Sequence, residues 1–157
     1  MSQLYKTIFG RRLNKTMTLG EAISLLESKD LIAVGEVAEL AVSMKSGVER
    51  CSKNYPGIDL VSDKQIKHAR TNPENPVHGG KLRAYISVKN TTSTILAVVT
   101  ERLTGKEYYF ELPYSCYRHH NGSTIGIPFH ANGTPVLTNK WWKYQVDSLD
   151  ELCEMAK

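Results

Sequence analysis

The chain has 157 residues, of which 41% are hydrophobic and 23% are charged, and its net charge is +4. This composition excludes intrinsic disorder and fits one domain, residues 1–157, that is large enough to bury a core. The mild positive charge permits a polyanionic partner without requiring one.

The cysteines and the apolar runs set the expected compartment. The three cysteines are Cys51, Cys116 and Cys153, and none forms a CxxC pair. A disulfide framework is therefore not expected, and a reducing, cytoplasmic location is the simpler interpretation. No stretch approaches the roughly 20 apolar residues that cross a membrane, so we expect no membrane partner.

The first half of the chain predicts two helices. Thr18-Leu19-Gly20-Glu21 matches a capping box, which predicts a helix to about residue 28. Apolar residues at three-to-four spacing predict a second helix over 32–50, where Glu36 and Glu39 share a face.

A turn signal at 54–57 predicts the end of that helix and the start of a short strand over 58–61. The following stretch, 62–81, is polar and contains Asn-Pro and Gly-Gly turn formers, so a loop is expected. Its length suits a loop that enters a nucleic-acid groove. The DNA contacts expected from it are Lys64, Lys67 and Arg70.

Strict alternation predicts a strand over 82–89, with Ala84, Ile86 and Val88 on one face and Arg83, Tyr85, Ser87 and Lys89 on the other. A second apolar strand is expected over 94–100. A turn at 103–106 then predicts a hairpin with 107–112.

The pattern does not place the segment 113–144, which is rich in turn formers, but Ser148-Leu149-Asp150-Glu151 predicts a capped C-terminal helix. The order of elements indicates an α/β or α+β domain, with a mixed central sheet flanked by helices. Its core should span about 32–112, and 113–157 should add an irregular segment and the last helix.

Four polar residues are arranged to suit phosphodiester hydrolysis. That chemistry needs carboxylates that hold a hard cation, and a cationic group beside the attacking water. The side chain of Asp59 should point to the face of its short strand opposite the face of Ile58 and Leu60. On the next strand, Ser87 and Lys89 should share one face. If the two strands are neighbours, these side chains converge, with Glu36 or its substitute Glu39 behind them.

These segments resemble the core of the PD-(D/E)xK nucleases, which include restriction endonucleases and Holliday-junction resolvases. The resemblance covers residues 32–112 and is carried by Gly35-Glu36-Val37-Ala38-Glu39, Pro56-Gly57-Ile58-Asp59-Leu60 and Tyr85-Ile86-Ser87-Val88-Lys89-Asn90. It implies a restriction-endonuclease-like fold and a Mg²⁺ site, for which Mn²⁺ can substitute. Asp59 and Glu36 would be the metal ligands, and Lys89 would position the attacking water.

Two departures from the family pattern are visible. Pro56 lies three residues before Asp59, and Ser87 stands where the family usually has an acid. The resemblance therefore needs a carboxylate from elsewhere, for which Glu101 and Glu111 are candidates.

The resemblance implies a Mg-dependent endodeoxyribonuclease that acts as a homodimer, so that each of its two sites acts on one strand of the DNA. The catalytic residues would be Asp59, Lys89, Glu36 and Ser87. The alternative is a catalytically inactive nucleic-acid-binding domain that keeps the nuclease-like fold.

The histidine-rich segment allows other interpretations. His119, His120 and His130 with Asn132 are residue types of an HNH nuclease, and Cys116 with His119 and His120 resembles part of a zinc site. We favour a DNA-contacting loop formed by Arg118, His119, His120 and Asn121.

A basic and aromatic cluster lies at 139–144, with Trp141 and Trp142 at its centre. It predicts either a half-buried strand with the tryptophans packed inward or a stacking surface for nucleic acid.

Overall fold

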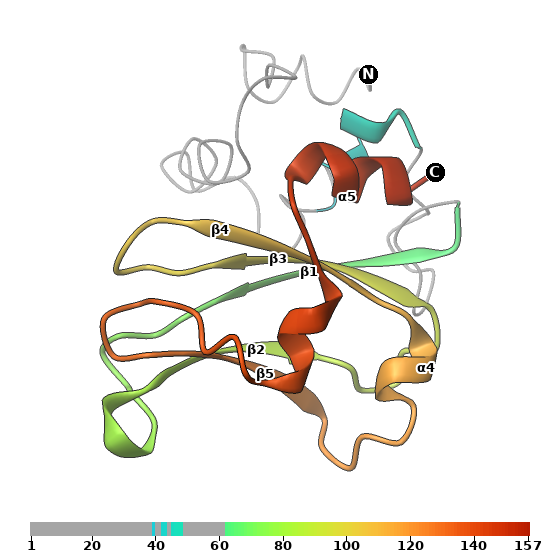
Figure 1. Cartoon of the computed structure of the whole chain (residues 1–157). Helices are drawn as coiled ribbons and strands as arrows, with labels where there is room; N and C mark the ends of the chain where they lie inside the picture. The colour runs from blue at the N-terminus through green and yellow to red at the C-terminus, as the bar shows by residue number, and fades with distance from the viewer. Residues whose placement is uncertain (1–38, 40–41, 44, 49–61) are drawn as a thin grey trace.

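The computed structural model describes residues 39, 42–43, 45–48 and 62–157 (Figure 1). Two β-sheets lie one below the other, and helix α5 covers the outer side of the larger sheet. The elements are β1 (Lys64–Arg70), η1 (His78–Gly80), β2 (Leu82–Ser87), β3 (Thr94–Thr100), β4 (Glu107–Leu112), α4 (Tyr114–Tyr117), β5 (Thr124–Phe129), η2 (Lys140–Tyr144), β6 (Gln145–Val146) and α5 (Leu149–Met155).

The larger sheet has the strand order β1-β3-β4-β6 and is mixed. β1 runs parallel to β3, whereas β3–β4 and β4–β6 are antiparallel. β2 pairs with β5 in a separate antiparallel sheet of two strands. The mixed α/β class is confirmed, but the expectation of one central sheet is wrong for the described residues, because β2 pairs away from β3.

The core lies between the two sheets. Its residues are set by the alternation of side chains between the two faces of each strand. In β2 the burial pattern alternates without exception: Leu82, Ala84 and Ile86 are buried while the residues between them are exposed. Their counterparts on β5 are Ile125, Ile127 and Phe129, and the larger sheet contributes Ile95, Ala97, Val99, Phe110 and Leu112. A two-stranded sheet is marginal alone, so this packing is what keeps β2 and β5 in place.

β1 corrects the expectation of a loop over 62–81. Residues Lys64–Arg70 form a strand, and only the following stretch, which contains η1, is loop-like. The strand was hidden by its polar composition, because Lys64, Gln65, Lys67, His68 and Arg70 outnumber the two apolar residues, Ile66 and Ala69, which are buried. Pairing with β3 supplies the backbone hydrogen bonds that the sequence pattern did not reveal.

The hairpin and the last helix are confirmed. β3 and β4 pair from Ile95↔Leu112 to Thr100↔Glu107. α5 begins after Ser148, whose hydroxyl oxygen accepts a hydrogen bond from the Glu151 N–H at 3.1 Å. The Glu151 carboxylate in turn accepts from the Asp147 N–H at 2.9 Å.

The segment expected to be irregular is more ordered than predicted. It holds α4, β5, η2 and β6 before α5. Turn formers such as Gly122, Gly126 and Pro128 concealed β5, although its Ile125 and Ile127 are fully buried. The helix predicted over 18–28 and the strand over 58–61 lie outside the described residues. Of the helix over 32–50, Glu39, Val42, Ser43, Lys45 and Ser46 are described as helical.

Cys116 and Cys153 are free thiols. Within the described parts of the chain, every helix is too short or too polar to traverse a lipid bilayer.

Glu101 is a fully buried acid at the turn between β3 and β4. Its carboxylate accepts from the backbone N–H of Leu103 at 2.9 Å and of Thr104 at 2.7 Å. The hydroxyls of Thr104 and Thr71 donate to it as well. Burial disfavours the charged form, but these hydrogen bonds outweigh it and hold the pKa of Glu101 below 4.5.

We predict that Glu101→Gln lowers the free energy of unfolding by about 2–3 kcal/mol, because an amide nitrogen then faces a backbone N–H. The depressed pKa stabilises the fold above pH 4.5, and this contribution is lost as the pH falls through the lower folded-state pKa. Urea denaturation between pH 7 and pH 3 should show a shallower acid dependence for the variant. The exposed neighbour Arg102→Gln is the control, and equal stability of Glu101→Gln and wild type would contradict the prediction.

Candidate nucleic-acid interface

Ser87 and Lys89 lie at the end of β2, on the same exposed side of the chain. Ser87 is the last residue of the strand and Lys89 lies in the turn that follows, and both are exposed. Between them, Val88 is buried and its N–H donates to the Ser123 carbonyl at 2.9 Å. Both side chains are exposed around a buried Val88, as the alternation predicts, but the strand ends at Ser87 and Lys89 lies in the turn rather than on the strand.

The other half of the predicted catalytic set is not described. Glu36 and Asp59, the implied metal ligands, lie outside the described residues. Glu39 is described as helical and half-buried. The structure thus places Lys89 and Ser87 of the predicted set, and its two implied metal ligands lie outside the described residues.

Neither carboxylate proposed to compensate for Ser87 is in position to do so. Glu101 lies beside Gly133, near the Leu82 end of β2, where a Cβ on Gly133 would approach its carboxylate to 2.6 Å. The strand between Leu82 and Ser87 is about 17 Å long. Glu111 is paired with Leu96, on the face of the larger sheet that points away from β2.

The loop after α4 is fixed by hydrogen bonds rather than free. The Arg118 N–H donates to the Tyr114 carbonyl, and the His120 N–H donates to the Tyr117 carbonyl, both at 2.9 Å. The His120 ring nitrogen Nε2 lies 2.7 Å from the Thr124 carbonyl oxygen. The His120 ring also meets Trp141 edge-on, with centroids 5.8 Å apart. Arg118, His119 and Asn121 remain exposed.

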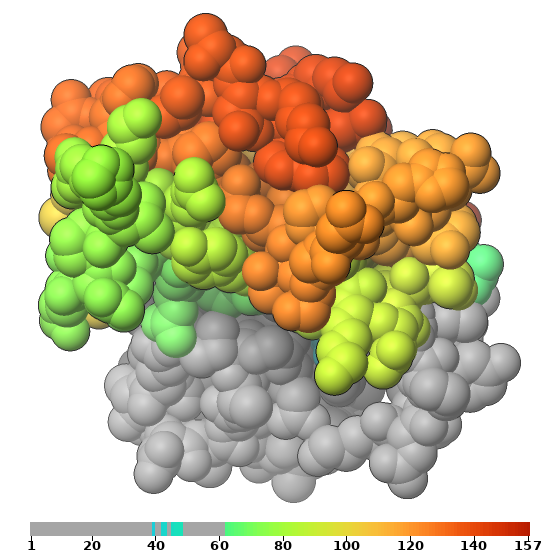
Figure 2. Space-filling view, turned by 90° about the horizontal axis from the view of Figure 1, so that it is seen from below, coloured from blue at the N-terminus to red at the C-terminus, as the bar shows by residue number. Residues whose placement is uncertain are grey.

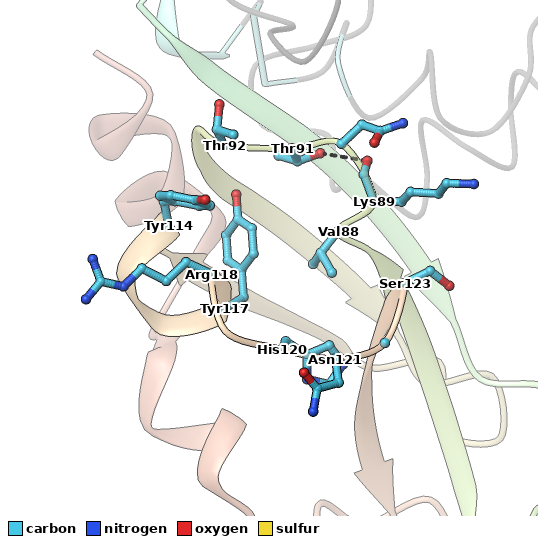
Figure 3. A pocket seen from close by; sticks show the side chains of 12 residues that line it. Val88, Lys89, Thr91, Thr92, Tyr114, Tyr117, Arg118, His120, Asn121 and Ser123 are labelled. Carbon is cyan, nitrogen blue, oxygen red and sulfur yellow. Dashed lines mark hydrogen bonds between the residues drawn. The ribbon is translucent and has the colours of Figure 1, made fainter.

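The segment after β2 and the loop after α4 border one open hollow of about 730 Å³ (Figure 3). Lys89 lies on one side of it and Arg118 on the other, and both side chains point outward, away from the hollow (Figure 3). Hydroxyl and amide groups complete the polar lining, from Thr91, Thr92, Asn121 and Ser123. Lys89 and the Arg118–Asn121 loop, predicted separately from the sequence, are therefore brought to one place.

Tyr117 forms the buried wall of this hollow. Its side chain is 3% exposed, and its hydroxyl donates to the Ser93 carbonyl. Burial raises the pKa of Tyr117 to about 12, so the hydroxyl stays protonated as a donor at physiological pH. This bond ties α4 to the turn that follows β2.

The other expected DNA contacts are not brought to the hollow. Lys64, Lys67 and Arg70 lie on β1 instead of a groove-entering loop. The register places Lys67 across from Ala97, on the face toward the core, whereas Lys64 and Arg70 pair with residues of the opposite face. They therefore do not form one basic surface.

The metal-binding alternatives are not supported by the described geometry. In residues 39, 42–43, 45–48 and 62–157, no three His, Cys, Asp or Glu side chains come together to hold a metal ion. His120 and His130 flank opposite ends of β5, so the described structure does not bring them together as the HNH interpretation expects. Cys116, His119 and His120 do not form the proposed zinc site.

The tryptophan cluster is part of the core. Residues Lys140–Tyr144 form a 3₁₀ turn, not a strand, because the Asn139 side chain accepts from the Trp141 N–H. Trp141 and Trp142 are each 5% exposed, and the Trp142 indole N–H donates to the Pro128 carbonyl at 3.2 Å. The tryptophan rings are therefore not available as a stacking surface.

One signal in the sequence was missed, namely the distribution of acidic residues. Segments 81–100 and 112–146 contain no Asp or Glu. These segments supply β2, β5 and every residue that lines the hollow. They hold six cations: Lys81, Arg83, Lys89, Arg118, Lys140 and Lys143. Because the whole chain carries only +4, the remainder is net negative and the positive charge is concentrated here.

We predict that Tyr117→Phe lowers the free energy of unfolding by about 1 kcal/mol, because the Ser93 carbonyl loses its donor. Amide hydrogen exchange in 91–93 and 114–118 should accelerate. Tyr114→Phe, at an exposed neighbour, is the matched control and should behave as wild type. Unchanged stability and unchanged exchange in Tyr117→Phe would show that the bond does not support the wall.

The sequence matches no protein-family model, and the comparisons with curated proteins and with solved structures gave no match. The function of this site is therefore inferred from its geometry and charge.

Proposed function

We propose that this protein is a DNA-binding domain that contacts phosphates at the hollow between the end of β2 and the loop after α4. The observation that carries the proposal is that Lys89 and Arg118 flank this hollow on segments that contain no acidic residue. A cationic surface favours a polyanion, since each neutralised phosphate releases a condensed counterion.

The polar lining suits a phosphate backbone in detail. Arg118 offers a planar set of N–H donors, which match phosphate oxygens in pairs. Thr92, Asn121 and Ser123 add neutral donors of the kinds that commonly contact phosphate and sugar. The loop is held in shape by the His120 and Tyr117 contacts, so little ordering would accompany binding.

We predict that Lys89→Gln and Arg118→Gln each weaken binding of a labelled oligonucleotide about five-fold, in a manner independent of sequence. Each should lower the slope of log affinity against log salt by about 1, because one phosphate contact is lost. Fluorescence anisotropy from 50 to 300 mM salt measures both quantities.

Lys106→Gln is the matched control, since Lys106 is an exposed lysine in the β3–β4 turn, away from the hollow. It should bind as wild type. If all three variants lose affinity equally, or if wild type binds no DNA, the proposed site is wrong.

A second candidate function is endonucleolytic cleavage of DNA, which the PD-(D/E)xK resemblance implies. One observation favours it: Lys89 lies at the hollow and shares its exposed side with Ser87, as the Ser-x-Lys pattern requires. The described residues do not supply the carboxylates for Mg²⁺ or Mn²⁺, so no step is assigned to a metal. Glu36 and Asp59 would have to supply them, and a homodimer would offer one site per strand.

For this second function, we predict that Lys89→Ala and Asp59→Ala abolish cleavage at protein concentrations that saturate the DNA. Arg118→Gln should cut at a near wild-type rate under the same conditions, because it affects binding only. Gel assays with duplex, branched and single-stranded DNA, in Mg²⁺ or Mn²⁺, measure the rate. Binding without any cleavage by wild type would leave the DNA-binding function alone.

A further inference from the structure

The solvent face of the β2–β5 sheet carries an exposed tyrosine, with one cation before it on β2 and another in the turn after β2. Tyr85 lies in the middle of β2 and is 51% exposed, although a tyrosine in a strand more often packs against a neighbour. Alternation within β2 places Arg83 on the same exposed face as Tyr85, two residues before it. Lys89 is exposed in the turn that follows the strand.

Gly126 gives the Tyr85 ring its position. Gly126 lies directly across from Tyr85 in the β2–β5 register. A Cβ on Gly126 would come within 3.4 Å of the Tyr85 ring and 3.2 Å of the Arg83 side chain. Both side chains thus lean across the strand pair over the space that glycine leaves open. Covering a glycine backbone is one role of such a ring, but it leaves half of Tyr85 exposed.

The sheet face continues into the phosphate site. Figure 2 views the molecule from below Figure 1, on the side where β2 and β5 lie, and shows the yellow-green and orange segments side by side at the surface. β2 and β5 contain no acidic residue. Lys89 belongs both to the exposed side of the β2 chain and to the hollow, so one strand of nucleic acid can contact both.

We propose that the β2–β5 face binds single-stranded DNA, with a base stacked on Tyr85 and phosphates held by Arg83 and Lys89. The proposal rests on the proposed DNA-binding function and specifies its substrate as a single strand. Every base has a π-face, so stacking on an aromatic side chain is tolerant of sequence. In a duplex these faces are already stacked on each other, and only the backbone contacts remain available.

We predict that wild type binds a fluorescein-labelled 12-nucleotide oligo-dT about ten-fold more tightly than a 12-base-pair duplex, as measured by anisotropy at 100 mM salt. Tyr85→Ala should remove most of this preference, because stacking of one base is lost. Its salt slope should stay at the wild-type value, since no phosphate contact is removed. Tyr85→Phe keeps the ring and should retain the preference.

Two further variants separate stacking from folding and from charge. Tyr85→Leu still covers Gly126 but has no aromatic face, so it should fold as wild type and lose the preference. Arg83→Gln should weaken binding of the single strand and lower the salt slope by about 1. Leu137→Ala, at an apolar residue that is 68% exposed, is the surface control and should match wild type.

The results distinguish this inference from the function on which it rests. If Lys89→Gln and Arg118→Gln weaken binding while Tyr85→Ala and Tyr85→Leu match wild type, the stacking role is overturned and phosphate binding stands. A wild type that prefers the duplex also overturns the inference. If neither oligo-dT nor duplex binds, both proposals fail.

Discussion

The packing of the two-stranded β2–β5 sheet on the larger sheet is the constraint on which the rest of the structure depends. Ile86, Ile125, Ile127 and Phe129 are at most 1% exposed, and each such side chain stabilises the fold by about 1.5–3 kcal/mol when buried. Because side chains alternate along a strand, burying one face of β2 forces Arg83, Tyr85 and Ser87 outward. The same burial that stabilises the fold therefore displays Arg83 and the exposed tyrosine ring on the opposite face.

Acidic and basic residues are also separated along the chain. The segments that build β2, β5 and the hollow have no carboxylate, whereas acids lie in the β3–β4 turn and around α5. Glu101 shows the other use of an acid here: four donors surround it and keep it ionised inside the fold. Its role is to shape the β3–β4 turn. Segments 81–100 and 112–146 carry six cations and no acid, and this concentration of positive charge is what the proposed DNA-binding function rests on.

Local patterns predicted some elements well and failed where tertiary contacts decide. Three features were visible in the sequence: the alternation at 82–89, the hairpin over 94–112 and the Ser148 cap. Each depends on residues that are close together in the chain, because alternating burial and helix capping are set locally. β1 was missed because a strand rich in Lys, Gln and His is stabilised by pairing with β3, which a single segment does not reveal. β5 was hidden by Gly126 and Pro128.

Lys89 and the loop Arg118–Asn121 were predicted as separate features, and only the fold shows that they line one hollow. Tyr85 was assigned correctly to the outer face, but its role required knowing that a glycine lies across from it.

The central claim is that one continuous surface, from the β2–β5 face to the hollow beside α4, meets nucleic acid. Backbone amide chemical-shift mapping during titration with oligo-dT tests it most directly. The account predicts that perturbations cluster at 83–92 and 117–126, while α5 and the β3–β4 turn stay unchanged. Perturbations confined to α5 or to the turn at 101–106, with none along β2, would contradict it.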